Sequence, residues 1–274
     1  MRVGFVGLGS QGAPMAEMIA AAGLPLTVWA RRAVAVEPFA RAGAAVADDL
    51  VAVGRASDVV GVCVVDDAGV DEVCRPLLDG LAPGATIAVH STVRPDTVER
   101  LAVRSGDVGV SVLDAPVMGG AAAARNRSLM VVAGGDADVV ERCRPMLEAY
   151  ADPIVHVGPV GAGQVAKLLF NLLFVVNVEV HERVADLAVR LGIDRSAAAA
   201  VLGQLRASSF APRLIAREIA PGALEHSAAI LTKDVGHVLD ILGDAAVDTA
   251  PLDELARGAL DTLRRMAAGS DSGH

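Results

Sequence analysis

Arg2-Val-Gly-Phe-Val-Gly7-Leu-Gly9-Ser-Gln-Gly12 is the stretch that decides the fold, and it opens the chain. A short apolar run, Val3–Val6, is typical of a buried strand, and three glycines follow it with the spacing G-x-G-x-x-G. Gly7 permits a tight turn, Gly9 lets the backbone approach a pyrophosphate, and Gly12 allows close contact between helix and sheet. The N-terminus of the following helix offers N–H donors to an anion. The motif therefore predicts a dinucleotide-binding turn.

Short β-branched runs alternate with helical segments through the first part of the chain, which predicts parallel strands joined by crossover helices. The expected fold is α/β, with a Rossmann-like, doubly wound sheet in residues 1–160. The predicted strands are Val3–Val6, Leu26–Trp29, 59–65, Thr86–Val89, 110–113, 129–133 and 154–157. The predicted helices are 13–22, 71–78, 96–104 and 137–149.

No strand is predicted after Gly158-Pro159, so residues 161–274 are expected to form an all-helical domain of catalysis and oligomerisation. A long interdomain helix from about 164 to 191, ended by Gly192, should join the two domains. Shorter helices are expected near 195–205, 213–220, 231–242 and 253–268, with a loose tail at 269–274.

The formal net charge of −9 argues against a partner made of nucleic acid, which needs a basic surface. The first folded element begins at Arg2 without a preceding leader, which predicts a cytoplasmic protein. The apolar stretch 168–180 contains Asn171 and Glu179 and is too short to cross a bilayer, so no membrane is expected. The six histidines and three cysteines show no ligand spacing, and no metal is expected.

Two arginines, Arg31 and Arg32, follow the second predicted strand, where an acidic residue usually binds the ribose hydroxyls of NAD. Guanidinium groups instead suit the 2′-phosphate of NADP, because they donate bidentate hydrogen bonds to phosphate oxygens. The sequence thus favours NADP over NAD. Solvated arginines on a loop are the alternative.

Four motifs resemble the β-hydroxyacid dehydrogenase family, of the 3-hydroxyisobutyrate dehydrogenase type, and together they cover nearly the whole chain. They are Gly7-Leu-Gly-Ser-Gln-Gly12, Asp114-Ala-Pro-Val-Met-Gly-Gly120, Gly161-Ala-Gly-Gln-Val-Ala-Lys167-Leu-Leu-Phe-Asn171 and Lys233-Asp234. The resemblance implies hydride transfer between NADP(H) and a small hydroxyacid or semialdehyde. It also implies a homodimer or homotetramer formed through the helical domain.

By this resemblance Lys167 is the general acid/base, and Asn171 holds the substrate or the lysine. The two residues are four apart and would share one helix face. Reduction of a carbonyl leaves an alkoxide that must be protonated, and a positioned lysine can supply that proton. A surface lysine is the alternative reading of Lys167.

The substrate carboxylate is expected at the Gly-Gly turn, but Met118 stands where the family has serine or threonine. A thioether cannot donate a hydrogen bond, so small hydroxyacids should be poor substrates. Alternatively the N–H groups of Gly119 and Gly120, with Lys233, hold the carboxylate and Met118 only packs. The candidate substrate residues are Ser91, Met118, Gly119, Gly120, Lys167 and Asn171. The candidate cofactor residues are Gly7, Leu8, Gly9, Gln11, Gly12, Arg31, Arg32, Val65, Asp66, Val70, Thr92 and Lys233.

Two other functions fit the same two-domain plan. An imine reductase would use NADPH similarly, although Lys167 counts against it because such enzymes usually carry aspartate or tyrosine at that place. A non-catalytic NADP-binding assembly module is disfavoured because both Lys167 and Asn171 are present.

Overall fold

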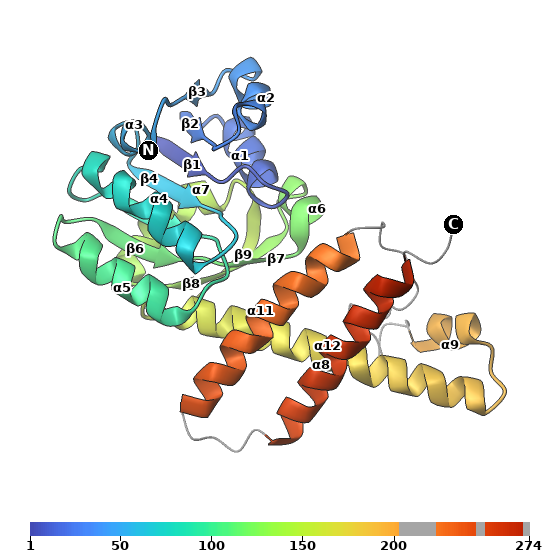
Figure 1. Cartoon of the computed structure of the whole chain (residues 1–274). Coiled ribbons are helices and arrows are strands. Elements are labelled where there is room, and N and C mark those ends of the chain that lie inside the picture. The colour runs from blue at the N-terminus through green and yellow to red at the C-terminus, as the bar shows by residue number, and fades with distance from the viewer. Residues whose placement is uncertain (203–222, 245–249, 271–274) are drawn as a thin grey trace. The chain divides into compact units, whose positions relative to one another are not determined.

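The computed structural model describes residues 1–202, 223–244 and 250–270, and the chain divides into two compact units, Met1–Lys167 and Leu168–His274 (Figure 1). The division falls inside one long helix.

The first unit is built on a nine-stranded sheet of order β3-β2-β1-β4-β5-β6-β8-β7, with β9 paired to β8. The pairs β1–β2, β1–β4, β4–β5 and β5–β6 are parallel, so the expected doubly wound arrangement is confirmed. The strand order reverses between β1 and β4. The loops that follow these two strands leave a crevice between them at the carboxyl ends of the strands. The strands are β1 Val3–Val6, β2 Leu26–Trp29, β3 Ala45–Val46, β4 Val59–Val62, β5 Thr86–Val89, β6 Ser111–Asp114, β7 Val117–Met118, β8 Leu129–Gly134 and β9 Ala151–Gly158.

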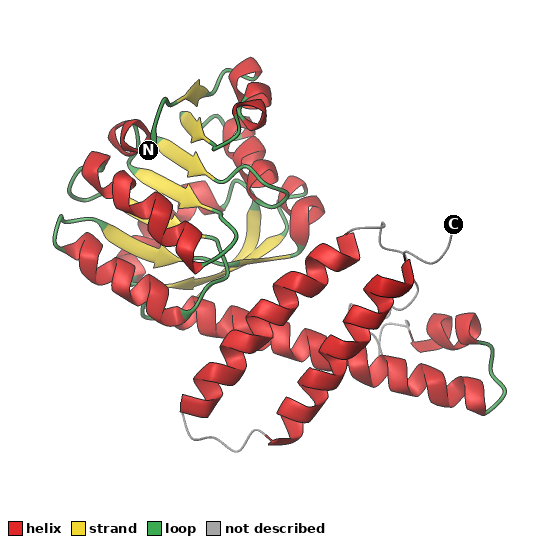
Figure 2. Ribbon diagram, viewed as in Figure 1, coloured by secondary structure: helices red, strands yellow, loops and turns green. Residues whose placement is uncertain are grey.

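Helices cover both faces of this sheet (Figure 2) and form two separate apolar cores. Alternate residues of each strand enter opposite cores: Phe5 packs with α1 and α7, whereas Val6 packs with α3, α4 and α5. Burial on both faces explains why the central strands β1, β4 and β5 are nearly continuous apolar runs. The helices are α1 Gly12–Ala21, α2 Glu37–Arg41, α3 Leu50–Arg55, α4 Asp67–Gly80, α5 Pro95–Gly106, α6 Gly120–Arg125 and α7 Ala137–Leu147.

Several elements differ from the prediction. The sheet is mixed, because β8 runs antiparallel to β6 and β7. The predicted strand 59–65 ends at Val62, since Val64 N–H bonds to the side chain of Ser91 and not to a neighbouring strand. The short elements β3, β7, α2, α3 and α6 were not predicted. Each has only two to six residues, too few to show a periodic pattern.

The second unit continues α8 (Ala162–Arg190), which confirms the long helix predicted at 164–191. Gly192 follows it in a left-handed conformation with φ +87°. The other helices are α9 Arg195–Leu202, α11 Ala223–Asp244 and α12 Ala250–Ser270. Residues of α8, α11 and α12, among them Leu172, Val235 and Ala259, form a third apolar core.

The predicted helices 231–242 and 253–268 are therefore parts of longer ones, and residues 269–270 belong to α12 and not to a loose tail. The predicted helix 213–220, residues 203–205 of the helix 195–205, and residues 271–274 of the tail lie outside the described residues.

Helix α8 is long and apolar enough to cross a membrane by length and composition alone. That test is weak, because the core helix of a water-soluble protein passes it equally. Two polar side chains of α8, those of Asn171 and Glu179, are buried and hydrogen-bonded to residues of α11 and α12. These bonds favour a core helix.

Candidate active site

A cavity of about 320 Å³ lies at the carboxyl ends of β1, β2 and β4. The structure brings several of the predicted cofactor residues together around it. Those that line it are Gly7, Leu8, Gly9, Arg31, Arg32 and Val65.

The three glycines of the first turn differ in what they allow. A Cβ on Gly7, which has φ +97°, would lie 2.0 Å from the carbonyl oxygen of Cys63, and one on Gly12 would lie 1.9 Å from the carbonyl oxygen of Gly7. A Cβ on Gly9 would meet nothing within 4 Å. Gly7 and Gly12 are therefore required by packing, whereas Gly9 leaves open space at the helix N-terminus. Such a cradle fits a dinucleotide pyrophosphate.

The cavity has a basic wall beyond the end of β2. Arg31 and Arg32 follow β2 directly, are exposed, and line the cavity beside Trp29. No carboxylate lines this cavity. Guanidinium groups at this place are donors that an anionic group could use.

The loop after β4 places its three predicted residues differently. Val65 is 75% exposed and lines the cavity. Asp66 caps α4, where its carboxylate accepts a hydrogen bond of 2.8 Å from Gly69 N–H. Val70 is fully buried in the core beneath α4. Val70 therefore packs beneath the loop, and its predicted role at the cofactor stays untested.

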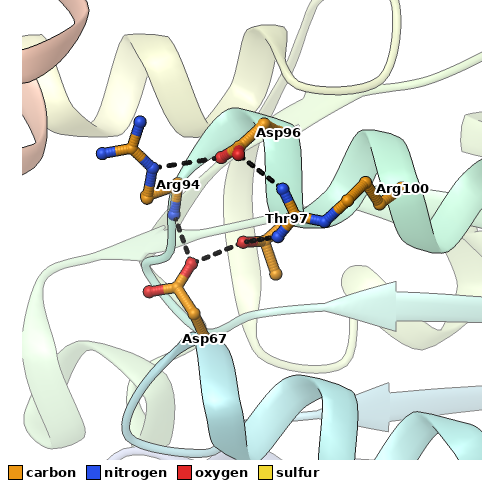
Figure 3. Close-up of polar contacts among 5 residues, drawn as sticks. All are labelled: Asp67, Arg94, Asp96, Thr97 and Arg100. Carbon is orange, nitrogen blue, oxygen red and sulfur yellow. Dashed lines mark hydrogen bonds and ion pairs between the residues drawn. The ribbon is translucent and has the colours of Figure 1, made fainter.

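Polar contacts tie the loop after β4 to the loop after β5 (Figure 3). Asp67 Oδ1 accepts hydrogen bonds from Arg94 N–H at 2.9 Å and from the hydroxyl of Thr97 at 2.6 Å. Arg94 and Arg100 pair with the two oxygens of Asp96, at 3.2 and 2.5 Å. The N-termini of α4 and α5 are thus joined.

The loop after β5 carries Ser91 and Thr92. Ser91 is 3% exposed, and its hydroxyl accepts a hydrogen bond of 2.8 Å from Val64 N–H. This side chain is therefore part of the hydrogen bonding inside the loop cluster, and its role in substrate binding stays a prediction. Thr92 is partly exposed beside it.

The side chain of Gln164, in the first turn of α8, meets the same loop. Its Oε1 accepts from Val93 N–H at 3.0 Å, and its Nε2 donates to the carbonyl oxygen of Ser91 at 2.9 Å. Gln164 is fully buried. The Gln164 carboxamide therefore binds the backbone on both sides of Thr92.

Asp114, the last residue of β6, holds the start of α8. It is fully buried, and its oxygens accept from Gly161 N–H at 2.9 Å and Gln164 N–H at 2.8 Å. Burial raises its pKa to about 6, and the backbone N–H donors, including that of Gly163, oppose the shift. The carboxylate is thus ionised at neutral pH and occupies the positive end of the helix dipole.

The Gly-Gly turn lies beside the glycine-rich loop. Gly119 and Gly120 have positive φ values of +125° and +77°, and a Cβ on Gly120 would lie 3.9 Å from Nε2 of Gln11. Met118 precedes them on β7, paired with Met130, and is only 8% exposed. The candidate carboxylate-binding turn and the candidate cofactor turn are therefore neighbours, and the burial of Met118 favours the packing alternative.

The predicted catalytic lysine lies in the second turn of α8. Lys167 is the last residue of the first unit, and its side chain is half-buried. Because Asp114 and Gln164 hold the preceding turn, Lys167 is carried by a helix that starts at the carboxyl edge of the sheet.

In the second unit the structure joins the other two predicted residues through a third. Asn171 Nδ2 donates a 2.7 Å hydrogen bond to Asp234 Oδ2, and Lys233 Nζ lies 3.3 Å from Asp234 Oδ1. Asp234 is fully buried and Asn171 is 5% exposed. Lys233 and Asp234 lie in the interior of α11 and not at its start. The Lys–Asp pair is therefore not a solvated one.

A buried histidine, His90, connects the loops that follow β5 and β6. His90 Nδ1 lies 2.8 Å from the carbonyl oxygen of Ala115, so Nδ1 carries the proton and Nε2 accepts from the Tyr150 hydroxyl at 3.0 Å. Burial lowers the pKa of His90 to about 4. The ring is therefore neutral and serves to connect the two strands.

Sequence reasoning did not assign roles to Gln164, Asp114 and Asp234, although all three stand in quoted motifs. Their signal is polarity within apolar or glycine-rich segments, which predicts a buried hydrogen-bonded group. Within the described ranges, no cluster of three histidine, cysteine, aspartate or glutamate side chains could hold a metal.

Comparison with known proteins gives matches along the whole chain. Residues 2–158 match the family model of the NAD binding domain of 6-phosphogluconate dehydrogenase, and residues 161–274 match that of the NAD-binding domain of NADP-dependent 3-hydroxyisobutyrate dehydrogenase. The chain is 32% identical to an NAD-dependent L-serine dehydrogenase of Pseudomonas aeruginosa, over 93% of this chain and 89% of that protein.

Two solved structures are also similar. The 3-hydroxyisobutyrate dehydrogenase of Mycobacterium tuberculosis with L-serine has a TM-score of 0.85 and 26% identity, covering 98% of this chain and 94% of that one. Psf3 in complex with NADP+ and 2-OPP has a TM-score of 0.81 and 27% identity, covering 96% of this chain and 94% of that one.

Proposed function

Because the chain belongs to the 3-hydroxyisobutyrate dehydrogenase family of NAD(P)-dependent hydroxyacid oxidoreductases, we propose that it interconverts a small hydroxyacid and its semialdehyde with NADP(H) and Lys167 as acid/base. One observation carries the proposal. Lys167 lies one turn beyond Gln164, and Gln164 is hydrogen-bonded to Ser91 and Asp114. These two residues lie at the carboxyl ends of the strands, the same side of the sheet as the cavity.

The nicotinamide, when bound, supplies hydride to the carbonyl carbon or takes it from the alcohol. Lys167 donates a proton from Nζ to the substrate oxygen in reduction and accepts it in oxidation. Its half-buried place keeps part of the water away from that proton.

The composition of basic residues supports a role in proton transfer. Only two of the 24 lysines and arginines are lysines, Lys167 and Lys233, and both stand in family motifs. Arginine cannot lose its proton at any ordinary pH, whereas lysine can. A chain that uses arginine for almost every positive charge therefore retains lysine where the charge must be able to change.

Asn171 is placed to orient and not to transfer protons. Its Nδ2 is bonded to buried Asp234, so its Oδ1 is the acceptor that would bind the Lys167 ammonium or a substrate hydroxyl. Asp234 also pairs with Lys233, and therefore holds two of the proposed site residues.

NADP is the proposed cofactor. Arg31 and Arg32 line the cavity at the end of β2, where their guanidinium groups would donate to a 2′-phosphate. Known relatives include both an NAD-dependent enzyme and a structure with NADP+, so the preference of this chain rests on its own arginines.

The proposed carboxylate site is the Gly119–Gly120 turn. Both residues have positive φ values and no side chain, so their backbone N–H groups are not covered by a Cβ and would be the donors to the carboxylate. The substrate would then have its carboxylate near Gln11 and the glycine-rich loop.

The test is an NADPH-oxidation screen over C2 to C5 semialdehydes and ketoacids, run beside Lys167→Ala and Lys167→Arg. Both variants should lower kcat by about 10² to 10⁴ while NADPH affinity changes less than threefold. The arginine variant is the matched control, because it keeps the charge but cannot exchange the proton. A fall in kcat of less than threefold refutes the role of Lys167. Cyclic imines are added to the panel, and turnover of these alone would point to an imine reductase.

Assembly and location stay predictions. Large apolar side chains of α8, including Leu169, Phe170, Leu173 and Leu187, are 46–61% exposed, which is consistent with the expected homodimer or homotetramer. Light scattering at micromolar concentration tests it, and a monomer would refute it. The cytoplasmic location is tested by fractionation.

A further inference from the structure

We propose that Gln164 is a positioning residue that fixes Thr92 relative to the helix turn carrying Lys167, while Asp114 fixes the start of the same helix. The inference relies on the proposed function only for the roles of Thr92, at the nicotinamide ribose, and of Lys167.

Gln164 contacts the backbone on both sides of Thr92, once as a hydrogen-bond acceptor and once as a donor. Val93 N–H donates to Gln164 Oε1, and Gln164 Nε2 donates to the carbonyl oxygen of Ser91. The two backbone groups stand on either side of Thr92, so Gln164 holds the Thr92 backbone from both sides.

Only a carboxamide of this length can make both bonds. Glutamate could accept from Val93 but would place a charged oxygen against the carbonyl of Ser91, and methionine could do neither. Gln164 is fully buried and Ser91 is 3% exposed, so water cannot replace a lost partner without local opening. The site therefore specifies glutamine.

Asp114 anchors the other side of the same helix turn. A Cβ on Gly163 would lie 2.7 Å from Asp114 Oδ2, and one on Gly161 would lie 2.8 Å from Glu99 Oε1. Glycine at position 163 lets the backbone of the first turn of α8 approach the Asp114 carboxylate directly, whereas glycine at position 161 leaves room for the side chain of Glu99. The motif from Gly161 to Gln164 thus builds a joint between the sheet edge and α8.

The joint formed by Asp114 and Gln164 determines how far Lys167 lies from the Thr92 loop. Lys167 follows Gln164 by three residues, a rise of about 4.5 Å along the helix. A shift of α8 against the Thr92 loop would therefore displace the proton donor from the nicotinamide, and displacement by about 1 Å can lower a rate about 10²-fold. Gln164→Met should lower kcat by about 10- to 100-fold.

A binding comparison separates positioning from general damage. For Gln164→Met, the Kd of NADPH should rise about 5- to 10-fold, the effect of losing about one hydrogen bond. The Kd of 2′,5′-ADP, which lacks the nicotinamide and its ribose, should change less than twofold. The control is Val165→Ala, an exposed residue of the same helix turn, which should change neither constant. Equal losses for both ligands would overturn the proposal.

Amide hydrogen exchange tests the joint without any cofactor. In the wild-type protein Val93 N–H should exchange as slowly as the amides of β5, and rapid exchange would overturn the proposal even if no variant folds. Gln164→Met should speed Val93 exchange at least tenfold, and Gln164→Glu less, because the acceptor for Val93 is kept.

These outcomes are distinct from failure of the proposed function. If Lys167→Ala keeps its turnover, the acid/base role is wrong, yet exchange and fragment binding still test the joint. If Lys167→Ala loses turnover while Gln164→Met keeps kcat within twofold, the positioning role is wrong.

Discussion

Replacing Asp114 by asparagine should change how stability depends on pH. Burial raises the pKa of this carboxyl from 3.8 to about 6, so ionising it costs more in the folded protein than in the unfolded chain. A group with a raised folded pKa contributes stability that is complete below the unfolded pKa. That contribution is lost as the pH rises through the folded pKa.

The size of the effect follows from the shift. Two pKa units correspond to about 3 kcal/mol over the whole titration, of which about 1.4 kcal/mol falls between pH 5 and pH 8. The wild-type protein should therefore lose about 1.4 kcal/mol relative to Asp114→Asn across that range. The offset between the two proteins at any single pH also contains the hydrogen bonds to Gly161 and Gln164, so the change with pH is the quantity to compare.

Urea denaturation of both proteins at pH 5, 6, 7 and 8 measures this difference. Subtraction removes the titration of all other groups, provided that they are unaffected by the substitution. A stability difference that is constant within about 0.3 kcal/mol, or that changes in favour of the wild type as the pH rises, would refute the reasoning.

Three further outcomes are expected. Arg31→Ala should weaken NADPH binding by about 1.5–3 kcal/mol with little effect on NADH, measured by titration, and equal losses would leave Arg32 as the reader of the phosphate. Met118→Ser should lower the free energy of unfolding, measured in urea, by about 2–4 kcal/mol, because the side chain is buried. If stability is unchanged and kcat/KM for semialdehydes rises several-fold, Met118 instead faces the substrate. Asn171→Ala should lower both kcat and stability, the latter by about 1.5–3 kcal/mol in urea, because buried Asp234 loses a donor; unchanged stability would contradict the bond.

The sequence predicts the fold well where segments are long or buried on both faces. The strands Val3–Val6, Leu26–Trp29 and Thr86–Val89 have the predicted bounds, and the long helix α8 begins within two residues of its predicted start. Apolar runs and glycine spacing carry this information locally. The strand β8 was predicted at 129–133, but its antiparallel direction was not, since strand direction depends on pairing with distant residues.

The site is harder to predict from the sequence than the fold, because its main contacts join residues that lie far apart in the chain. Asp114 bonds to Gly161, 47 residues away, and Asn171 bonds to Asp234, 63 residues away. A motif shows which residues matter but not which atoms they contact. It could not show, for example, that the hydroxyl of Ser91 is used by Val64.

The scarcity of lysine also gives the protein an intrinsic chemical probe. Amine-selective acylation can address at most three groups in this chain: the Met1 amine, half-buried Lys167 and Lys233, whose side chain is 27% exposed. Each label would be resolved in the intact mass without digestion. The two side-chain labels report on different units, since Lys167 belongs to the first and Lys233 to the second. Labelling rates with and without NADPH would therefore follow ligand protection in each unit of the unmodified enzyme, with no introduced reporter group.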